Sequence, residues 1–261
     1  MNMNRLESLF GRKKSDLLSI YFTGGFPRKD SVVETIKCLA DAGVDMVEIG
    51  VPFSDPMADG PVIQHSSTVA LRNGMTLRQL IKDAKKAREA VDEMPFVLMG
   101  YLNPFMQYGF RKLFEDCRDA GIDALIVPDL PFEDYMADFK PLCDEFDIPM
   151  IMLITPETSE ERIKLIDANC EGFIYMVSSA STTGTKDRFS EEQLSYFKRI
   201  DSLELKHRRL IGFGISNPET LKEAWRYSSG AIIGSMFVKC LERNETIKGA
   251  VKDLMSTLGE V

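Results

Sequence analysis

Short apolar runs recur at regular intervals along the whole chain, and this pattern restricts its fold more than any other feature. None of the runs alternates between apolar and polar residues, so both faces of each segment should be buried, as in strands of a parallel sheet. The predicted strands are Leu17–Phe22, Met46–Ile49, Phe96–Met99, Ala124–Val127, Met150–Ile154, Phe173–Val177, Leu210–Phe213 and Ala231–Ile233.

The segments between these runs have helical periodicity, and several begin with a hydroxyl residue followed three positions later by Glu or Gln. That spacing is typical of a capping box at a helix N-terminus. The candidate pairs are Ser31/Glu34, Thr76/Gln79, Thr158/Glu161, Ser190/Gln193 and Ser216/Glu219. Several of these helices should end at a glycine with positive φ, namely Gly43, Gly121, Gly172 and Gly230.

Two junctions between a helix and a strand are nearly identical, Asp41-Ala-Gly-Val-Asp45 and Asp119-Ala-Gly-Ile-Asp123. Such self-similarity indicates repeated βα units. With no low-complexity linker dividing the chain, the sequence predicts an α/β fold: an eight-stranded TIM barrel, a single domain over residues 1–261 with extra helices. An open doubly wound sheet is the alternative, but Gly24-Gly25-Phe26-Pro27 does not have the spacing of its dinucleotide turn.

The charge and cysteine content restrict the partners and the compartment. A net charge of −8 and a pI near 5.0 argue against nucleic acid or an anionic membrane as a partner. The chain shows no signal-like or membrane-spanning apolar run, and its five cysteines are widely spaced, so we expect a cytoplasmic protein. His65 and His207 are not at ligand spacing from each other or from a cysteine, so no metal site is expected.

Comparison of the two similar junctions singles out Glu48 as a candidate catalytic acid. Glu48 stands where the second copy carries Ile126, so a carboxyl group replaces a core residue. Burial raises the pKa of such a group toward the range that is useful for proton transfer near neutral pH. The alternative is a structural ion pair with a nearby Lys or Arg.

The loop that follows Glu48 carries a second candidate acid. It reads Val51-Pro-Phe-Ser-Asp-Pro-Met-Ala-Asp-Gly-Pro61, and its prolines stiffen it. Asp55 and Asp59 could serve only as turn formers. However, a loop after this strand could bring Asp59 over the barrel mouth, where it would act with Glu48 on one substrate.

Small-residue loops follow the last three predicted strands. They are Thr182-Thr-Gly-Thr185, Gly212-Phe-Gly-Ile-Ser216 and Gly234-Ser235. Backbone N–H groups at glycine-rich helix N-termini bind phosphate without a lysine, and barrels often place phosphate after strands seven and eight. The alternative is that they are merely tight turns. Aromatic and aliphatic residues at strand ends could line a pocket for a flat ring or belong to the core: Tyr21, Tyr101, Leu153, Tyr175 and Phe213.

Three strings make the chain resemble a known family. Glu48-Ile-Gly-Val-Pro-Phe-Ser-Asp-Pro-Met-Ala-Asp-Gly-Pro61, Gly212-Phe-Gly-Ile-Ser216 and Gly234-Ser235 closely resemble the tryptophan synthase α chain, and the likeness extends from about Leu6 to about Glu242. The resemblance implies a lyase that splits indole-3-glycerol phosphate into indole and glyceraldehyde 3-phosphate by retro-aldol cleavage, late in tryptophan biosynthesis.

The resemblance also implies roles for individual residues. Glu48 would be the catalytic acid and base, Asp59 would hold the indole N–H, and Tyr175 would lie near Glu48. Phosphate would be bound at Thr183, Gly184, Phe213, Gly214, Gly234 and Ser235, with Thr183 also closing a lid onto the loop of Asp59. Indole would contact Tyr21, Met99, Ile126, Leu153 and Ile232.

The chain departs from the family pattern in two places. Ser179-Ala180-Ser181 stands where many members have Arg-Ala-Gly, and Thr155-Pro156 replaces Pro-Pro.

The family's α chain works with a β chain in an α2β2 heterotetramer, and it passes indole to that partner. The resemblance therefore implies a contact face at Asp55, Pro56, Asn103 and Pro131. It implies no cofactor in this chain, with pyridoxal phosphate bound only in the β partner. Two other functions fit the residues: a sugar-phosphate isomerase or epimerase on the same barrel, and a non-catalytic regulatory subunit. The positions of His65 and His207 disfavour the first, and the presence of Glu48 and Asp59 disfavours the second.

Overall fold

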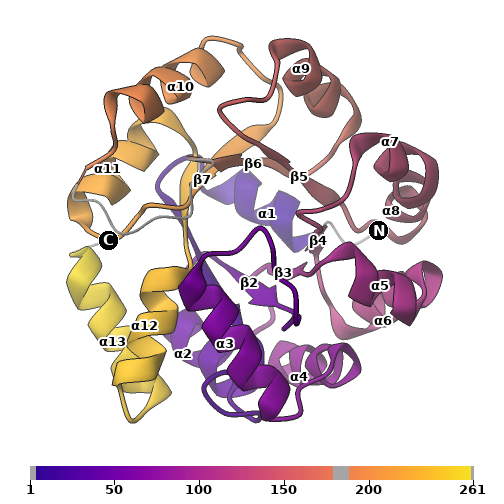
Figure 1. Ribbon diagram of the computed structural model, residues 1–261, viewed down its shortest axis with the longest axis vertical. Helices are drawn as coiled ribbons and strands as arrows, with labels where there is room; N and C mark the ends of the chain where they lie inside the picture. Colours follow the sequence, from indigo (N-terminus) through magenta and orange to yellow (C-terminus); the bar gives the residue numbers. More distant parts are fainter. Residues whose placement is uncertain (1–3, 179–187, 260–261) are drawn as a thin grey trace.

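Eight parallel strands form a closed barrel in the order of the sequence, with β8 paired to β1 (Figure 1). The chain is described here by a computed structural model that covers residues 4–178 and 188–259. The strands are β1 Leu17–Thr23, β2 Met46–Gly50, β3 Phe96–Met99, β4 Ala124–Ile126, β5 Met150–Ile154, β6 Phe173–Val177, β7 Arg208–Gly212 and β8 Gly230–Ile233. The predicted TIM barrel is therefore confirmed.

The predicted strands agree with the observed ones to within two residues. The largest difference is at β7, which begins at Arg208 and ends at Gly212. Phe213 was predicted to continue this strand, but its φ of +69° turns the chain out of the sheet. This turn starts the loop after β7, in which phosphate binding was predicted.

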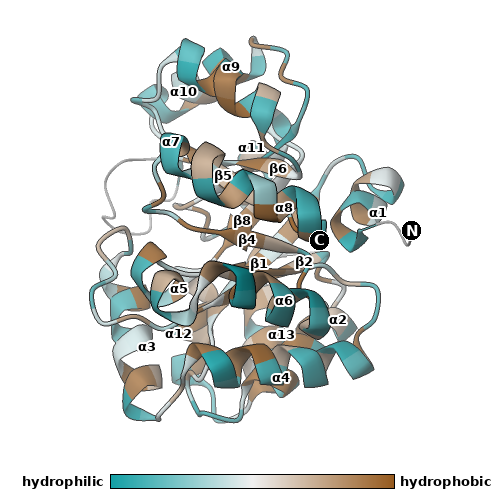
Figure 2. Cartoon of the chain, turned by 90° about the vertical axis from the view of Figure 1, so that its right-hand side faces the viewer, coloured by the Kyte–Doolittle hydropathy of each residue, from teal (hydrophilic) through white to brown (hydrophobic). Residues whose placement is uncertain are grey.

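Helices surround the barrel (Figure 2), and most of their buried residues are hydrophobic. They are α1 Arg5–Arg12, α2 Val32–Asp41, α3 Pro61–Arg72, α4 Leu77–Ala90, α5 Leu102–Tyr108, α6 Phe110–Ala120, α7 Phe132–Asp134, the π-helix η1 Tyr135–Phe139, α8 Lys140–Phe146, α9 Glu160–Asn169, α10 Glu191–Asp201, α11 Pro218–Tyr227, α12 Ser235–Arg243 and α13 Ile247–Leu258. The expected extra helices are therefore found before β1 and in several connections that contain more than one helix.

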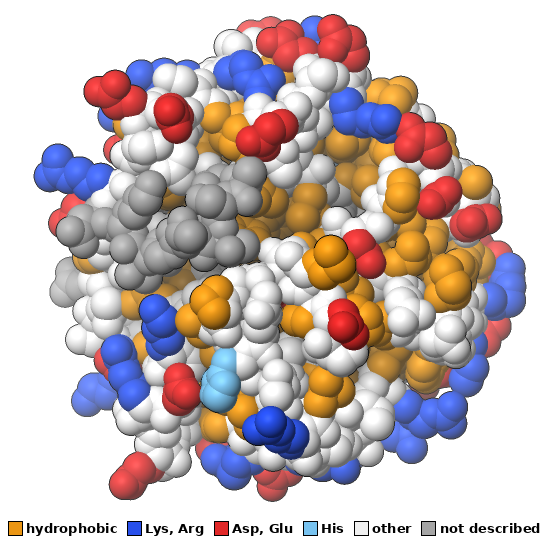
Figure 3. All heavy atoms as spheres, in the orientation of Figure 1, with side chains coloured by type: hydrophobic (Ala, Val, Ile, Leu, Met, Phe, Trp, Pro, Cys, Tyr) orange, Lys and Arg blue, Asp and Glu red, His pale blue; other side chains and the backbone are white. Residues whose placement is uncertain are grey.

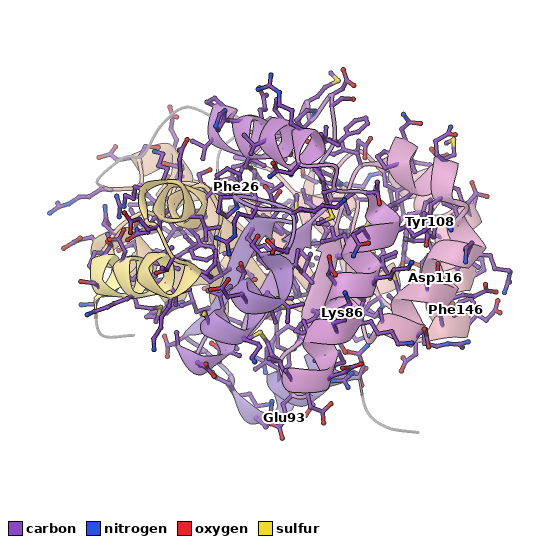
Figure 4. All side chains as sticks on the ribbon, turned by 90° about the horizontal axis from the view of Figure 1, so that it is seen from below. Phe26, Lys86, Glu93, Tyr108, Asp116 and Phe146 are labelled. Carbon is purple, nitrogen blue, oxygen red and sulfur yellow. The ribbon has the colours of Figure 1, made fainter. Side chains whose placement is uncertain are left out.

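Side chains on the outside of the barrel join neighbouring helices to one another. Tyr108, at the end of α5, donates its hydroxyl hydrogen to Asp116 on α6, and Figure 4 shows both residues on the outer rim. No helix in the described parts of the chain is long and apolar enough to cross a membrane.

The helix caps were predicted less accurately than the strands. Ser190 and Gln193 form the complete capping box at α10, and Thr76 accepts a hydrogen bond from the Gln79 N–H at α4. Ser31 is the N-cap residue of α2 as predicted, but its hydroxyl donates to the carbonyls of Phe26 and Arg28 and forms no capping bond. The other two predictions were wrong, because the caps of α9 and α11 are the next residues along, Ser159 and Asn217. Neighbouring polar residues can each serve as the N-cap of a helix, and the tertiary packing around the helix start determines which of them does so.

Two of the four predicted glycines lie at helix ends, Gly43 directly after the cap of α2 and Gly121 as the cap of α6, whereas Gly172 lies two residues beyond the Cys170 cap of α9. Gly43, Gly121 and Gly172 have positive φ, whereas Gly230 is the first residue of β8. A Cβ at Gly230 would lie 2.6 Å from the Cβ of Leu17, so this glycine allows β1 and β8 to close the barrel.

The two similar junctions make equivalent contacts at the end of the barrel that α1 covers. The Asp45 carboxylate accepts from the Leu18 N–H at 2.8 Å, and the Asp123 carboxylate accepts from the Phe96 N–H at 2.8 Å. Each aspartate thus binds the strand that precedes its own. The repeated sequence therefore encodes a repeated link between neighbouring strands.

Asp123 also links β4 to α1 and to the outer helix α4. Its carboxylate forms ion pairs with Arg88 at 2.9 Å and with Arg5 of α1 at 3.3 Å. The side chains of Arg88 and Asp123 are 10% and 5% exposed, so solvent screens this pair little. The Arg88 guanidinium also stacks 3.5 Å from the centre of the Phe96 ring.

Replacement of Asp123 by Ala should leave Arg88 as an uncompensated buried charge. We expect the free energy of unfolding to fall by about 3–5 kcal/mol, as for other broken buried pairs. Asp92 also pairs with Arg5, but its side chain is 85% exposed, so Asp92→Ala should cost less than about 1 kcal/mol. Urea denaturation of both variants measures the difference, and equal losses would contradict the role given to Asp123.

Candidate active site

Glu48 and the predicted indole-pocket residues share the interior face of the barrel. Tyr21 pairs with Glu48, Leu153 with Tyr175, Ile232 with both Gly212 and Ser19, and Met99 with both Gly50 and Ile126. Residues that pair between strands lie on the same face of the sheet, as do residues two apart on one strand. All of these residues are linked by such steps, so they lie on one face. Figure 3 shows a hollow near the centre of the face seen in Figure 1, with hydrophobic side chains around it.

The carboxyl group of Glu48 is fully buried on β2 (0% exposed). Its Oε1 accepts a hydrogen bond from the Ser19 hydroxyl at 3.0 Å, and its Oε2 has no hydrogen-bond partner among the described residues. Burial raises the pKa of Glu48 to about 8, and the bond from Ser19 opposes the rise. No ion pair with Glu48 occurs among the described residues, so the ion-pair alternative is wrong in this structure. The group is largely protonated at neutral pH.

Asp59 lies in the loop between β2 and α3, and Tyr101 fixes its position. The Tyr101 hydroxyl donates to Asp59 Oδ2 at 2.7 Å and accepts from the Ala58 N–H at 3.0 Å. Its ring packs against Phe53, with 5.2 Å between the ring centres. Burial raises the pKa of Asp59 to about 6, against the lowering effect of the Tyr101 bond, so Asp59 is mostly ionised at neutral pH.

Two tyrosines lie across glycines of the neighbouring strands and narrow the barrel interior. A Cβ at Gly50 would lie 2.2 Å from the Tyr21 hydroxyl oxygen, and a Cβ at Gly212 would lie 2.2 Å from that of Tyr175. Only glycine therefore leaves room for these rings. Burial is the main cause that raises the pKa of Tyr21 and of Tyr175, and negative charge on Glu48 or Asp59 raises both further, so the four side chains lie close enough to interact electrostatically.

The loop after β7 has two successive residues in the left-handed region, Phe213 (φ +69°) and Gly214 (φ +76°). The buried Ser178 hydroxyl holds this turn by donating to the Phe213 carbonyl at 2.7 Å, and Tyr175 packs edge-on against the Phe213 ring. Thr183 and Gly184, two of the predicted phosphate-binding residues, lie outside the described residues, as does Ser179-Ala180-Ser181.

Gly234 and Ser235 form the N-terminus of α12 directly after β8. In the described parts of the chain, no carbonyl accepts from the backbone N–H of Gly214, Gly234 or Ser235. Gly234 packs against Tyr21, where a Cβ would lie 3.3 Å from the ring. The predicted phosphate residues of β7 and β8 thus meet beside the predicted indole pocket.

The remaining predicted pocket residues lie on the same interior face of the barrel. Met99, Ile126 and Ile232 are buried, and Leu153 is partly exposed. Of the predicted partner contacts, Asp55 and Pro131 are exposed in the loops after β2 and β4, and Asn103 is exposed in α5, which follows β3. Pro56 differs, because it is buried within its own chain.

The chain matches the family model described as "Tryptophan synthase alpha chain" over residues 8–260. The chain belongs to the tryptophan synthase alpha chain family. It is 54% identical to the tryptophan synthase alpha chain of Parabacteroides distasonis over 256 residues, covering 98% of this chain and 99% of the relative. It is also 54% identical to that of Phocaeicola vulgatus over 252 residues, covering 96% and 97%.

Solved structures of this family have the same fold. Tryptophan synthase subunit alpha from Legionella pneumophila superposes with a TM-score of 0.87 at 29% identity, covering 98% of this chain and 97% of that one. Tryptophan synthase from Mycobacterium tuberculosis superposes with a TM-score of 0.88 at 26% identity, covering 98% and 97%. The chain is therefore a lyase of tryptophan biosynthesis that cleaves indole-3-glycerol phosphate, and the isomerase alternative is set aside.

Reasoning from the sequence missed three residues that position the site. Tyr101 was predicted only to line a pocket, whereas it also holds Asp59, and neither Ser19 nor Ser178 was singled out. A polar residue inside an apolar strand was the available signal for Ser19. Among the described residues, no group of three His, Cys, Asp or Glu side chains could hold a metal ion.

Burial of Glu48 should reduce stability in a way that depends on pH. Its pKa is raised from 4.5 to about 8 in the folded chain, so the cost of ionisation appears as the pH rises through this window and is absent below it. Glu48→Gln should therefore match the wild type near pH 4 and exceed it by on the order of 2–4 kcal/mol above pH 8. Denaturation across pH measures this, and a gain that does not grow with pH would contradict it.

Proposed function

We propose that Glu48 and Asp59 carry out the cleavage within one catalytic domain formed by residues 1–261. The buried carboxyl group of Glu48 is the observation that supports this most directly, since its pKa is about 8 and one oxygen has no partner among the described residues. An acid poised near the working pH is suited to both donate and accept a proton. Asp59, ionised at the same pH, accepts a hydrogen bond from the indole N–H.

Glu48 alone can carry out both proton transfers that the cleavage needs. Protonated Glu48 donates its proton to the indole ring carbon that carries the glycerol chain. The resulting carboxylate then takes the proton from the hydroxyl group on the adjacent chain carbon. The carbon–carbon bond breaks as that oxygen becomes the aldehyde of glyceraldehyde 3-phosphate, and indole leaves. Glu48 ends in its starting state, while Asp59 stabilises the positive charge that forms on the ring nitrogen.

The substrate would span the barrel mouth from the acids to the loops after β7 and β8. Indole fits among Tyr21, Met99, Ile126, Leu153 and Ile232, while Tyr175 encloses Glu48 from β6. The phosphate group would take backbone N–H groups at Phe213, Gly214, Gly234 and Ser235, together with Thr183 and Gly184. The short helix N-terminus of α12 adds its positive dipole end.

Glu48→Gln should abolish indole release from indole-3-glycerol phosphate, because the amide can neither give nor take the proton. Asp59→Asn should weaken cleavage by about 10²-fold or more, as for other lost transition-state contacts. Indole formation by the purified variants, with and without a β chain, measures this. A fully active Glu48→Gln protein would remove the mechanism, whereas a folded but inactive wild type would favour a regulatory subunit.

The pH profile of kcat/KM should be bell-shaped. Activity should rise as Asp59 ionises, with a pKa of about 6, and fall as Glu48 ionises, with a pKa of about 8. Tyr101→Phe removes the bond that lowers the pKa of Asp59, so the acidic limb should move to higher pH. Tyr108→Phe is the matched control, since it removes a tyrosine–carboxylate bond on the outer rim. An acidic limb that stays in place in Tyr101→Phe would contradict the assignment to Asp59.

We also propose that a β chain binds the face formed by the loop after β2 and by the segments that follow β3 and β4. The assembly would be a cytoplasmic α2β2 heterotetramer with pyridoxal phosphate only in the β chain. Exposed methionines lie in the same three connections as the predicted contacts Asp55, Asn103 and Pro131: Met57 (90% exposed) in the loop after β2, Met106 (54%) in α5 and Met136 (37%) in η1. Flexible apolar side chains of this kind suit protein interfaces. Pro56 supports the loop from inside. The five free thiols and the acidic charge are compatible with the cytoplasm.

Met57→Glu should weaken binding to the β chain about tenfold or more, because a charge would replace an apolar contact. Cleavage by the isolated chain should stay unchanged. Leu165→Glu on the outer helix α9 is the control, since Leu165 is 44% exposed away from this face. Titration of β-chain activity with each variant measures the affinity, and unchanged affinity in Met57→Glu would move the interface elsewhere.

A further inference from the structure

A buried hydroxyl group lies beneath the catalytic carboxyl group inside the barrel. Ser19 occupies the middle of β1, where its neighbours Leu18 and Ile20 are apolar, and it is 0% exposed. A buried hydroxyl needs a hydrogen-bond partner, and that of Ser19 is Glu48 Oε1 at 3.0 Å. The polar residue is therefore explained by Glu48.

The strand register sets the direction of this bond. Tyr21 pairs with Glu48, whereas Ser19 pairs with Met46, two residues earlier on both strands. Ser19 thus lies one interior layer closer to α1 than Glu48 does. Its hydroxyl holds Oε1 from the closed end of the barrel, and Oε2 keeps no partner among the described residues.

No other described side chain competes for this task. Tyr21 on β1 and Tyr175 on β6 interact electrostatically with Glu48 but form no described hydrogen bond with it. Asp59 in the next loop is also acidic, so it is not a countercharge for Glu48. No Lys, Arg or His pairs with Glu48 in the described parts of the chain. Ser19 is therefore the described side chain that donates a hydrogen bond to this carboxyl group.

We propose that Ser19 is a positioning residue: its hydroxyl fixes one oxygen of Glu48 toward the closed end of the barrel, so that the other oxygen faces the substrate in both protonation states. This inference rests on the proposed role of Glu48. A hydroxyl is suited to the task because it can donate to Oε1 both in the carboxylate and in the carboxylic acid, which leaves the acid proton on the oxygen that faces the substrate. Its bond to the charged form is the stronger one, so it also favours ionisation.

The test compares kcat/KM across pH for the wild type, Ser19→Ala and Ser19→Thr. Loss of the hydroxyl in Ser19→Ala should move the alkaline limb up by roughly one pH unit. It should also lower kcat by about tenfold, with KM little changed, since orientation rather than substrate binding is lost. Ser19→Thr keeps the hydroxyl and should hold the limb near its wild-type position.

Thr35→Val is the matched control, because Thr35 is a buried hydroxyl residue on α2 whose oxygen has no described partner. It should leave both limbs in place. A merely structural role for Ser19 would lower stability without moving the alkaline limb, and that result would overturn the inference.

Glu48→Gln separates the two possible failures. If Glu48→Gln is inactive and Ser19→Ala keeps the wild-type limb, the positioning role fails and the role of Glu48 stands. If Glu48→Gln is active, both fail. A wild-type profile without an alkaline limb would overturn the inference as well, because the ionisation of Glu48 would then not control the rate.

Discussion

Burial of one carboxyl group inside a closed barrel is the constraint on which the rest of this structure depends. Eight strands exclude water from Glu48, and the free energy of ionising it without a countercharge rises accordingly. The proton is therefore retained up to a pKa of about 8. Asp59 is less enclosed and stays ionised near neutrality, so the two acids differ in protonation state because their surroundings differ.

The scaffold maintains this enclosure from two sides. At the open end, Gly50 and Gly212 leave room for the rings of Tyr21 and Tyr175 to lie across the interior. Strands β7 and β8 lead directly to the N–H groups of the predicted phosphate site. At the opposite end, Asp123 pairs with Arg88 of α4 and with Arg5 of α1, so that α1 is held against this end of the barrel. Stability is thus concentrated at the closed end and chemistry at the open end, as in other barrels of this type.

Much of this could be predicted from local sequence patterns. Continuous apolar runs identified all eight strands, and the contrast between Glu48 and Ile126 identified the acid, because strand burial leaves a direct trace in composition. Contacts between distant residues leave no such trace. Tyr101 reaches Asp59 from 42 positions away, and Ser19 reaches Glu48 only through the register of β1 and β2. The observed N-caps of α9 and α11 lie one residue after the predicted ones, because several neighbouring polar side chains could serve as the cap.

The protonation state of Glu48 can be measured directly. In protein labelled with carbon-13 at the glutamate carboxyl groups, the Glu48 resonance is the one that Glu48→Gln lacks, and its position can be followed by NMR as the pH is raised. We expect a midpoint at about 8 for the buried carboxyl group in the folded chain. A midpoint near the ordinary value of 4.5 would contradict it, because Glu48 would then be ionised at neutral pH and could not donate the first proton.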